Sequence, residues 1–282
     1  MPTTNKMTAA LFTVFTAATT LAATSAAHAQ TPDGAASATD PAPVVTAAPS
    51  PAARGTSDDP NIDRGFLLPP AMTQPAGSVT YNNYELLLHG VTYGITDNVQ
   101  ASITVLSPIV QDMPLIGFGA VKARILSVDR FHLAVQGSLG WAHVFNSSDI
   151  NGGDVYTAGV GAFASYCLRE DCSSLVSASA TYQAAFPGSF SDRADMVIYG
   201  GSIVHSVGRH VKLLGEVASA AGGKIGSGDV QNIDGLLVGY GVRFHTDAIA
   251  ADVGFIKPVS GGATDGDFIM GLPFVSVSYR WQ

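Results

Sequence analysis

The sequence has few charged residues and, after its first thirty positions, no long apolar run. Asp, Glu, Lys and Arg make up 13% of the 282 residues, against about 25% in a typical soluble domain. Mean hydropathy is nevertheless +0.25, and no later stretch reaches the roughly 18 apolar residues of a spanning helix. Alternating strands in lipid produce this combination, because each strand has a lipid-facing apolar side and a polar or small one.

Basic residues are too few for a nucleic-acid partner. Lys and Arg total 14 against 22 Asp and Glu, which gives a formal net charge of -8. Binding nucleic acid requires clustered positive charge to neutralise phosphates, and the sequence contains no basic stripe. We therefore expect no nucleic-acid partner.

Cysteine occurs only at Cys167 and Cys172. Two strand-end cysteines at this spacing can reach the Cα separation of about 5.5–6 Å that a disulfide requires. In an oxidising compartment we expect them to form a disulfide across the turn; two unlinked residues are the alternative. A metal site needs more ligands than this pair supplies, and none lies nearby in the sequence, so we expect no metal and no cofactor.

The first 61 residues indicate export followed by a linker. Lys6 precedes an apolar, alanine-rich stretch, and Ala27-His28-Ala29 has the form that signal peptidase cleaves. We expect a signal peptide at residues 1–29, with an Ala/Thr-rich disordered tail as the alternative. Nine of the 15 prolines fall between Pro32 and Pro75, and residues 30–61 are predicted to be a disordered periplasmic linker.

Residues 62–282 are predicted to form one all-β domain, a closed antiparallel transmembrane β-barrel. Runs rich in Val, Tyr, Gly, Ala and Ser have the length of tilted strands that cross a bilayer. The strands are expected at Val79–Tyr93, Val99–Ser107, Gly117–Leu126, Phe131–His143, Val155–Leu168, Leu175–Phe186, Met196–Val207, Val211–Ala221, Ile233–His245, Ile249–Lys257 and Phe268–Trp281.

The connections between these strands alternate between short and long. Residues 96–98, 127–130 and 208–210 are tight turns, whereas residues 144–154 and 222–232 are long. Outer-membrane barrels show this alternation, with short periplasmic turns and long external loops. The architecture of a soluble β-sandwich does not require it.

The strand count and the strand faces agree with a barrel. In Phe131–His143, for example, Leu133, Val135 and Leu139 share one face, which fits one apolar side of a wall. Single-chain barrels have even strand numbers, and Ile62–Met72 is the only candidate for a twelfth strand. Pro69 and Pro70 would restrict it to a short edge piece. About twelve strands are expected, with ten or fourteen as alternatives.

Three features together resemble bacterial outer-membrane β-barrel proteins of the porin-like or transporter-like kind. They are the signal peptide, the hairpin turn Tyr93-Gly94-Ile95-Thr96-Asp97-Asn98, and the closing run Val275 to Gln282. In that run Tyr279 and Trp281 are similar to the carboxy-terminal signal that the barrel-assembly machinery reads, although Gln282 rather than an aromatic residue stands last. The resemblance implies an outer-membrane location, contact with outer-membrane lipids and assembly by that machinery.

Charges inside the predicted strands indicate a polar lumen. An Arg or Lys facing lipid near the midplane would cost about 2–4 kcal/mol, so most of these side chains are expected to point inward. They either select a solute by its charge or form ion pairs that close a narrow barrel. The candidates are Glu85, Lys122, Arg124, Lys212, Glu216, Arg243, Asp252 and Arg280.

No catalytic site is evident. His205 and Ser206 are adjacent, so they point to opposite faces of a strand and cannot act as a lipase pair. The long loops gather acids, for which binding of divalent cations is one hypothesis and ordinary solvated loops are the preferred interpretation. These acids are Asp149, Asp154, Asp192, Asp195, Asp229, Asp234, Asp265 and Asp267.

Together these features predict a non-enzymatic outer-membrane barrel that acts as a passive pore or small-solute transporter. A non-conducting structural or adhesive barrel is the alternative, and a barrel enzyme acting on lipid is less favoured.

Overall fold

A computed structural model describes residues 58–106, 114–144, 153–187, 194–221, 235–259 and 271–281. Within these ranges, no helix is long and apolar enough to cross a membrane. Outside them lie the predicted signal peptide, most of the predicted linker, and the loop residues Asp149, Asp192, Asp229, Asp234, Asp265 and Asp267.

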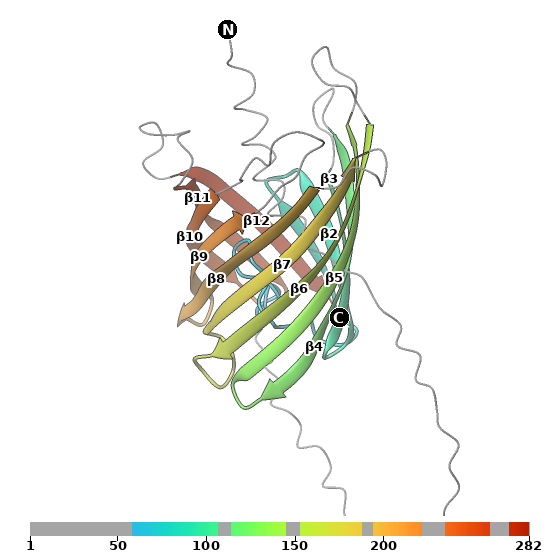
Figure 1. Ribbon diagram of the computed structural model, residues 1–282. Helices are drawn as coiled ribbons and strands as arrows, with labels where there is room; N and C mark the ends of the chain where they lie inside the picture. Colours follow the sequence, from blue (N-terminus) through green and yellow to red (C-terminus); the bar gives the residue numbers. More distant parts are fainter. Residues whose placement is uncertain are drawn as a thin grey trace, which may run out of the picture.

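The described residues form a closed antiparallel barrel of twelve strands, as predicted (Figure 1). Each strand pairs with its neighbours in sequence, and the first pairs with the last. The strands are β1 (Val79–Tyr84), β2 (Leu88–Thr96), β3 (Val99–Leu106), β4 (Leu115–Val128), β5 (Phe131–Val144), β6 (Gly153–Cys167), β7 (Leu175–Pro187), β8 (Ala194–Gly208), β9 (Val211–Ala221), β10 (Gly235–His245), β11 (Ile249–Pro258) and β12 (Leu272–Trp281).

The barrel closes along β1 and β12. Their register runs from Val79 opposite Trp281 to Tyr84 opposite Ser276. In hydrocarbon no water is available to satisfy backbone amides and carbonyls, so an open sheet edge would cost several kcal/mol per unpaired group. Closure removes both edges.

The two ends of the barrel differ in their connections, as the alternation predicted. One end, called the short-turn end below, carries the connections at residues 97–98, 129–130, 168–174, 209–210 and 246–248. The other, the long-loop end, carries the connections at 107–114, 145–152, 188–193, 222–234 and 259–271, together with one tight turn at 85–87 that the alternation did not predict. Because Val79 pairs with Trp281, the wall starts and finishes at the short-turn end.

The twelfth strand is not where the sequence placed it. The predicted strand Val79–Tyr93 is two strands, β1 and β2, joined by a tight turn at residues 85–87. Glu85 and Leu86 adopt positive φ angles of 52° and 62°. Asn and Gly usually occupy such positions in hairpin turns, and because neither is present here, the sequence does not indicate a turn. Ile62–Met72 is not a strand at all, so the predicted count is correct for a different reason.

The wall has an apolar outer surface and a more polar inner one. Outward side chains alternate with inward ones along each strand, and Val135 and Leu139 on β5 are 40% and 60% exposed. Inward neighbours such as Gln136 and Ser138 are buried. This confirms the predicted period of two and produces a surface suited to lipid acyl chains.

Residues 58–78, called the internal segment below, fold back inside the barrel. At one end the backbone carbonyl of Asp58 accepts a hydrogen bond from Arg280 Nη2 at 3.4 Å, and at the other Gly77 N donates to Gly94 O at 2.7 Å. Both contacts are at the short-turn end. The segment begins before the domain boundary expected at residues 61 and 62, since Asp59 and Asn61 are already buried.

A charge placed on the outer surface should cost most in the middle of a strand. Val160, midway along β6, and Val128, at the end of β4, are 54% and 53% exposed. We expect Val160→Arg to lower the free energy of unfolding in lipid vesicles by about 2–4 kcal/mol and the control Val128→Arg by about 0–1 kcal/mol. Urea titration in vesicles measures both, and equal losses would contradict a bilayer around this surface.

Candidate functional site: the internal segment and its anchors

Six of the charged residues predicted to face the lumen contact the internal segment or one another inside the barrel. Lys212 and Glu216 come from β9, Arg243 from β10 and Asp252 from β11; the other two are Lys122 on β4 and Arg280 on β12. All six are buried. Since β9, β10, β11 and β12 are consecutive in the barrel, five of these charges line one side of the lumen.

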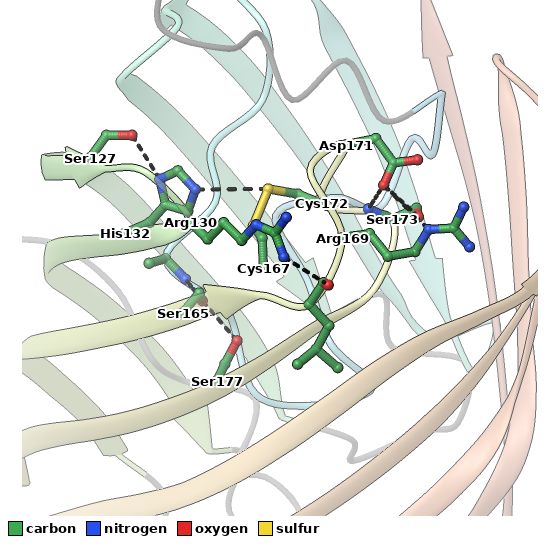
Figure 2. Close-up of a disulfide and its surroundings, with 12 residues drawn as sticks. Ser127, Arg130, His132, Ser165, Cys167, Arg169, Asp171, Cys172, Ser173 and Ser177 are labelled. Carbon is green, nitrogen blue, oxygen red and sulfur yellow. Dashed lines mark hydrogen bonds and ion pairs between the residues drawn. A yellow bond between two sulfur atoms is a disulfide. The ribbon is translucent and has the colours of Figure 1, made fainter.

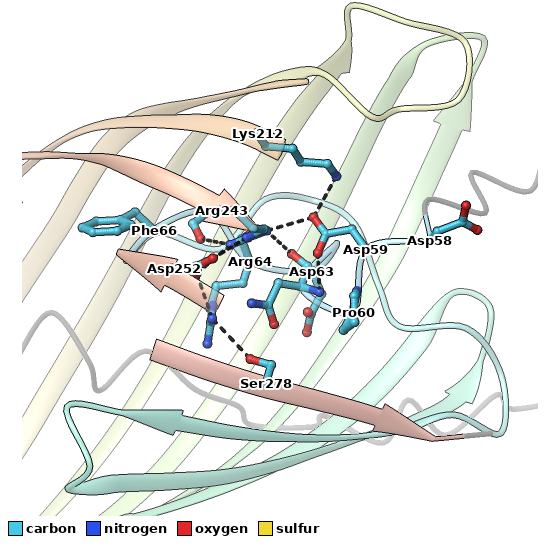
Figure 3. A network of polar contacts seen from close by, with 12 residues as sticks. Asp58, Asp59, Pro60, Asp63, Arg64, Phe66, Lys212, Arg243, Asp252 and Ser278 are labelled. Atoms are coloured by element: carbon cyan, nitrogen blue, oxygen red, sulfur yellow. Dashed lines mark hydrogen bonds and ion pairs between the residues drawn. The ribbon is translucent and has the colours of Figure 1, made fainter. Parts of the chain in front are cut away.

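Arg243 is the centre of an ionic network that joins the wall to the internal segment (Figure 3). Its guanidinium donates two hydrogen bonds to Asp252, at 2.6 and 3.0 Å, and a third to Asp59 Oδ2 at 3.1 Å. Lys212 Nζ lies 2.7 Å from the same Asp59 oxygen. Arg243 is cross-strand paired with both Lys212 and Asp252, so the barrel register sets this arrangement.

Asp59 is the acid that completes the network. Burial alone would raise the pKa of its carboxyl, but the positive charges of Arg243 and Lys212 more than offset burial and lower that pKa well below its usual range. Asp59 is therefore ionised at neutral pH and holds two wall cations at once.

Arg64 forms a second ionic contact between the internal segment and the wall. Its Nη2 donates to Asp252 Oδ2 at 3.0 Å and to Ser276 Oγ at 2.9 Å. The guanidinium also lies over the ring of Tyr84, 4.5 Å from its centroid, at a distance typical of a cation–π contact. Asp252 thus pairs with an arginine from the wall and one from the segment.

Glu216 binds the backbone of the internal segment directly. Its carboxylate accepts hydrogen bonds from the amides of Phe66, Leu67 and Leu68, the last two at 2.6 and 3.0 Å. A carboxylate that accepts several backbone amides forms strong charge-assisted bonds. This contact fixes the segment at its turn deep in the lumen.

The other lumenal cations hold backbone carbonyls of the segment. Lys122 Nζ donates to Asp63 O at 3.0 Å and to Pro70 O at 3.3 Å, and Arg280 Nη1 donates to Asp59 O at 3.3 Å. Arg124, by contrast, binds the β2–β3 turn through Asp97 O and Asn98 Oδ1. It therefore holds a turn at the short-turn end.

Glu85 does not face the lumen, contrary to prediction. It occupies the exposed β1–β2 turn, where Val275 N donates to its Oε1 at 2.5 Å. This prediction is wrong because the residue pattern indicates one continuous strand over Val79–Tyr93, whereas the chain turns at residues 85–87.

One aromatic ring of the segment fits a recess lined by glycines. A Cβ at Gly239, Gly241 or Gly254 would lie 3.1, 3.0 or 2.8 Å from Phe66 ring atoms. The Phe66 ring packs against Phe274 with centroids 4.5 Å apart, and Phe66 is fully buried. The strand glycines therefore provide the space that the ring occupies.

The two cysteines lie at the short-turn end of β6 and in the turn that follows. Cys167 and Cys172 form a disulfide with a Cα separation of 4.8 Å. His132 of β5 lies beside it, with Nε2 3.8 Å from Cys172 Sγ (Figure 2). These three are the only His, Cys, Asp or Glu residues in the described ranges that group closely enough to hold a metal ion.

The predicted assembly residues and two of the predicted loop acids lie on the wall. Tyr279 and Trp281 point outward from β12, with ring centroids 5.5 Å apart. Asp154 accepts hydrogen bonds from Trp141 Nε1 at 3.1 Å and pairs with His143 Nδ1 at 2.9 Å. Asp195 accepts from Tyr182 at 2.6 Å. Both acids bind aromatic or imidazole groups near the long-loop end.

The internal segment, including Asp59 and Arg64, is not predicted by any strand pattern in the sequence. The signal that was available is the charge-rich run Asp58-Asp59-Pro60-Asn61-Ile62-Asp63-Arg64, where the predicted linker ends. Inward charges on adjacent strands require counter-charges, and this run supplies both signs of charge outside the predicted strands.

No family model and no curated protein matches the chain. Among solved structures it is similar to in-vitro folded OmpT, an outer membrane protein of Vibrio cholerae, with 15% identity, a TM-score of 0.39, and coverage of 69% of this chain and 64% of that one. It is also similar to a loop L8 deletion mutant of OmpT from Vibrio cholerae, with 14% identity, a TM-score of 0.39, and coverage of 69% of this chain and 62% of that one. A third similar structure is CdiB from Acinetobacter baumannii, with 8% identity, a TM-score of 0.31, and coverage of 72% of this chain and 59% of that one. The chain spans less than two thirds of the length of these proteins.

Removing Arg243 should destabilise the barrel far more than removing an exposed arginine. We expect Arg243→Met to lower the free energy of unfolding by roughly 3–5 kcal/mol, because Asp59 and Asp252 would remain buried without their main partner. Arg130, whose pair with Glu170 is exposed, is the control, and Arg130→Met should cost about 0–1 kcal/mol. Urea unfolding in vesicles compares the two; similar losses would show that the network does not anchor the segment.

Proposed function

We propose that this protein is an outer-membrane pore or small-solute transporter, without covalent chemistry, whose passage is closed by its internal segment and opens when that segment moves. The single observation that supports this most is the set of polar bonds from Glu216, Arg243, Asp252 and Lys212 to residues 59–68. A barrel with a polar inner wall has a route for solutes, and the segment occupies it.

The outward apolar surface supports the outer-membrane location. Large exposed hydrophobic side chains occur on every strand from β2 to β12, and closed barrels with this pattern are suited to bilayers. With this location go the expected signal peptide at residues 1–29, contact with membrane lipids, and recognition of Tyr279 and Trp281 by the barrel-assembly machinery.

The polar nature of the anchors favours a segment that can leave. Apolar packing would hold a segment permanently in the lumen at least as well, since buried ion pairs are often no more stabilising than hydrophobic residues of the same volume. If the segment moved out, water entering the lumen would hydrate Asp252, Glu216 and Arg243. Release therefore costs less than it would from an apolar lumen, where the emptied wall would face water unfavourably.

A non-conducting structural barrel is the second candidate. It is favoured by the glycine-lined recess around Phe66, where a Cβ at three positions would crowd the ring. A recess so closely fitted suits a segment that stays in place and braces the wall.

Conductance of single anchor variants separates the two candidates. We expect the wild-type protein to be closed for most of the time in planar bilayers and Glu216→Ala to raise the open probability at least tenfold. The variant loses three charge-assisted bonds to the segment, and about 1.4 kcal/mol suffices for a tenfold shift. The control Glu170→Ala removes the same kind of side chain from an exposed turn, and its open probability should equal that of the wild type.

A lock between the segment and the wall completes the test. Ala71 and Ala134 pack in one buried cluster, so Ala71→Cys with Ala134→Cys should cross-link them. In a background lacking Cys167 and Cys172, the cross-link should abolish the openings of Glu216→Ala and a reductant should restore them. If Glu216→Ala never opens, the barrel is non-conducting; if the lock leaves conductance unchanged, the segment is not the gate.

A further inference from the structure

We propose that His132, Cys167 and Cys172 form a zinc-binding site that exists only when the disulfide is reduced. The inference does not depend on the proposed pore. Sequence spacing gave no third ligand near the cysteines, because His132 belongs to another strand, β5. The barrel places it there: His132 pairs with Ser165 on β6, and Cys167 is the next inward-facing residue of that strand.

The distance between the nitrogen and the Cys172 sulfur suits a tetrahedral zinc ion, which the two sulfur atoms can share once their bond is reduced. The three potential ligand atoms all lie within 4.8 Å of one another, and His132 Nε2 is 3.8 Å from Cys172 Sγ. With Zn–N near 2.1 Å and Zn–S near 2.3 Å, a tetrahedral site separates nitrogen from sulfur by about 3.6 Å. All three residues are buried, and three protein ligands leave one position for water.

The imidazole is already oriented for this role. Its Nδ1 is hydrogen bonded to Ser127 Oγ at 2.8 Å (Figure 2), which leaves Nε2 directed at the sulfur. Metal-binding histidines commonly hold the second ring nitrogen in such a bond, and this bond fixes the tautomer and the ring plane. Ser127 is therefore a positioning residue.

The chemistry requires a reductant. A dithiol donates two electrons to the Cys167–Cys172 disulfide and is itself oxidised to a disulfide, while two protons yield two thiols. Zinc then displaces both thiol protons and binds two thiolates and the neutral imidazole. The oxidised protein offers no thiolate, so metal binding reports the redox state of the turn.

Cobalt(II) absorption tests the proposal on the full chain, purified in detergent. After anaerobic reduction with a phosphine, and with two free thiols counted by alkylation and mass, we expect one cobalt per chain with a sulfur-to-cobalt charge-transfer band. Zinc should displace it. The unreduced protein should show no band, and neither should Cys167→Ser with Cys172→Ser.

Variants of the imidazole and its partner complete the test. We expect His132→Ala to weaken cobalt binding at least tenfold and Ser127→Ala to weaken it about tenfold. His205→Ala, at an exposed position on β8, is the matched control and should bind as the wild type does. A disulfide that the phosphine cannot reduce in the folded protein, a reduced protein without the band, or wild-type affinity in His132→Ala would each overturn the proposal.

Discussion

The pairing of Arg243 with Asp252 and Asp59 is the interaction on which the interior of this barrel depends. Two of these groups belong to neighbouring strands and the third to the internal segment. All three are buried, and away from water a buried charge must be balanced by an opposite one. Lys212 and Arg64 contribute to this balance, at Asp59 and Asp252 respectively. While the segment fills the lumen, its charges and those of the wall therefore balance one another.

This dependence links the fold to the proposed function. Closure between β1 and β12 satisfies the backbone and leaves an inner surface with charges from five strands. The segment neutralises and covers that surface with Asp59, Arg64 and the amides accepted by Glu216. A gate built from such contacts can exchange its protein partners for water, whereas a gate built only from apolar contacts cannot.

Much of the wall could be predicted from the sequence. Most strands have a local period-two pattern of apolar and polar residues, and most tight turns contain residues typical of turns, such as Asp, Asn and Gly. Ten of the eleven predicted strands match single observed strands. The exception, Val79–Tyr93, contains a turn at Glu85 and Leu86 without the Asn or Gly that usually marks one. The candidate twelfth strand Ile62–Met72 has no period-two pattern, because it pairs with no strand and its partners lie on several distant strands. The metal-compatible group at His132 was equally invisible, since only strand register brings it to Cys167 and Cys172.

The most direct test of the account is amide hydrogen exchange of Phe66, Leu67 and Leu68 in the protein in lipid vesicles. If Glu216 holds these amides inside the lumen, they should exchange slowly in the wild type and much faster in Glu216→Ala, while β-strand amides of the wall remain protected in both. Fast exchange of the three amides in the wild-type protein would contradict an internal segment bound within the barrel.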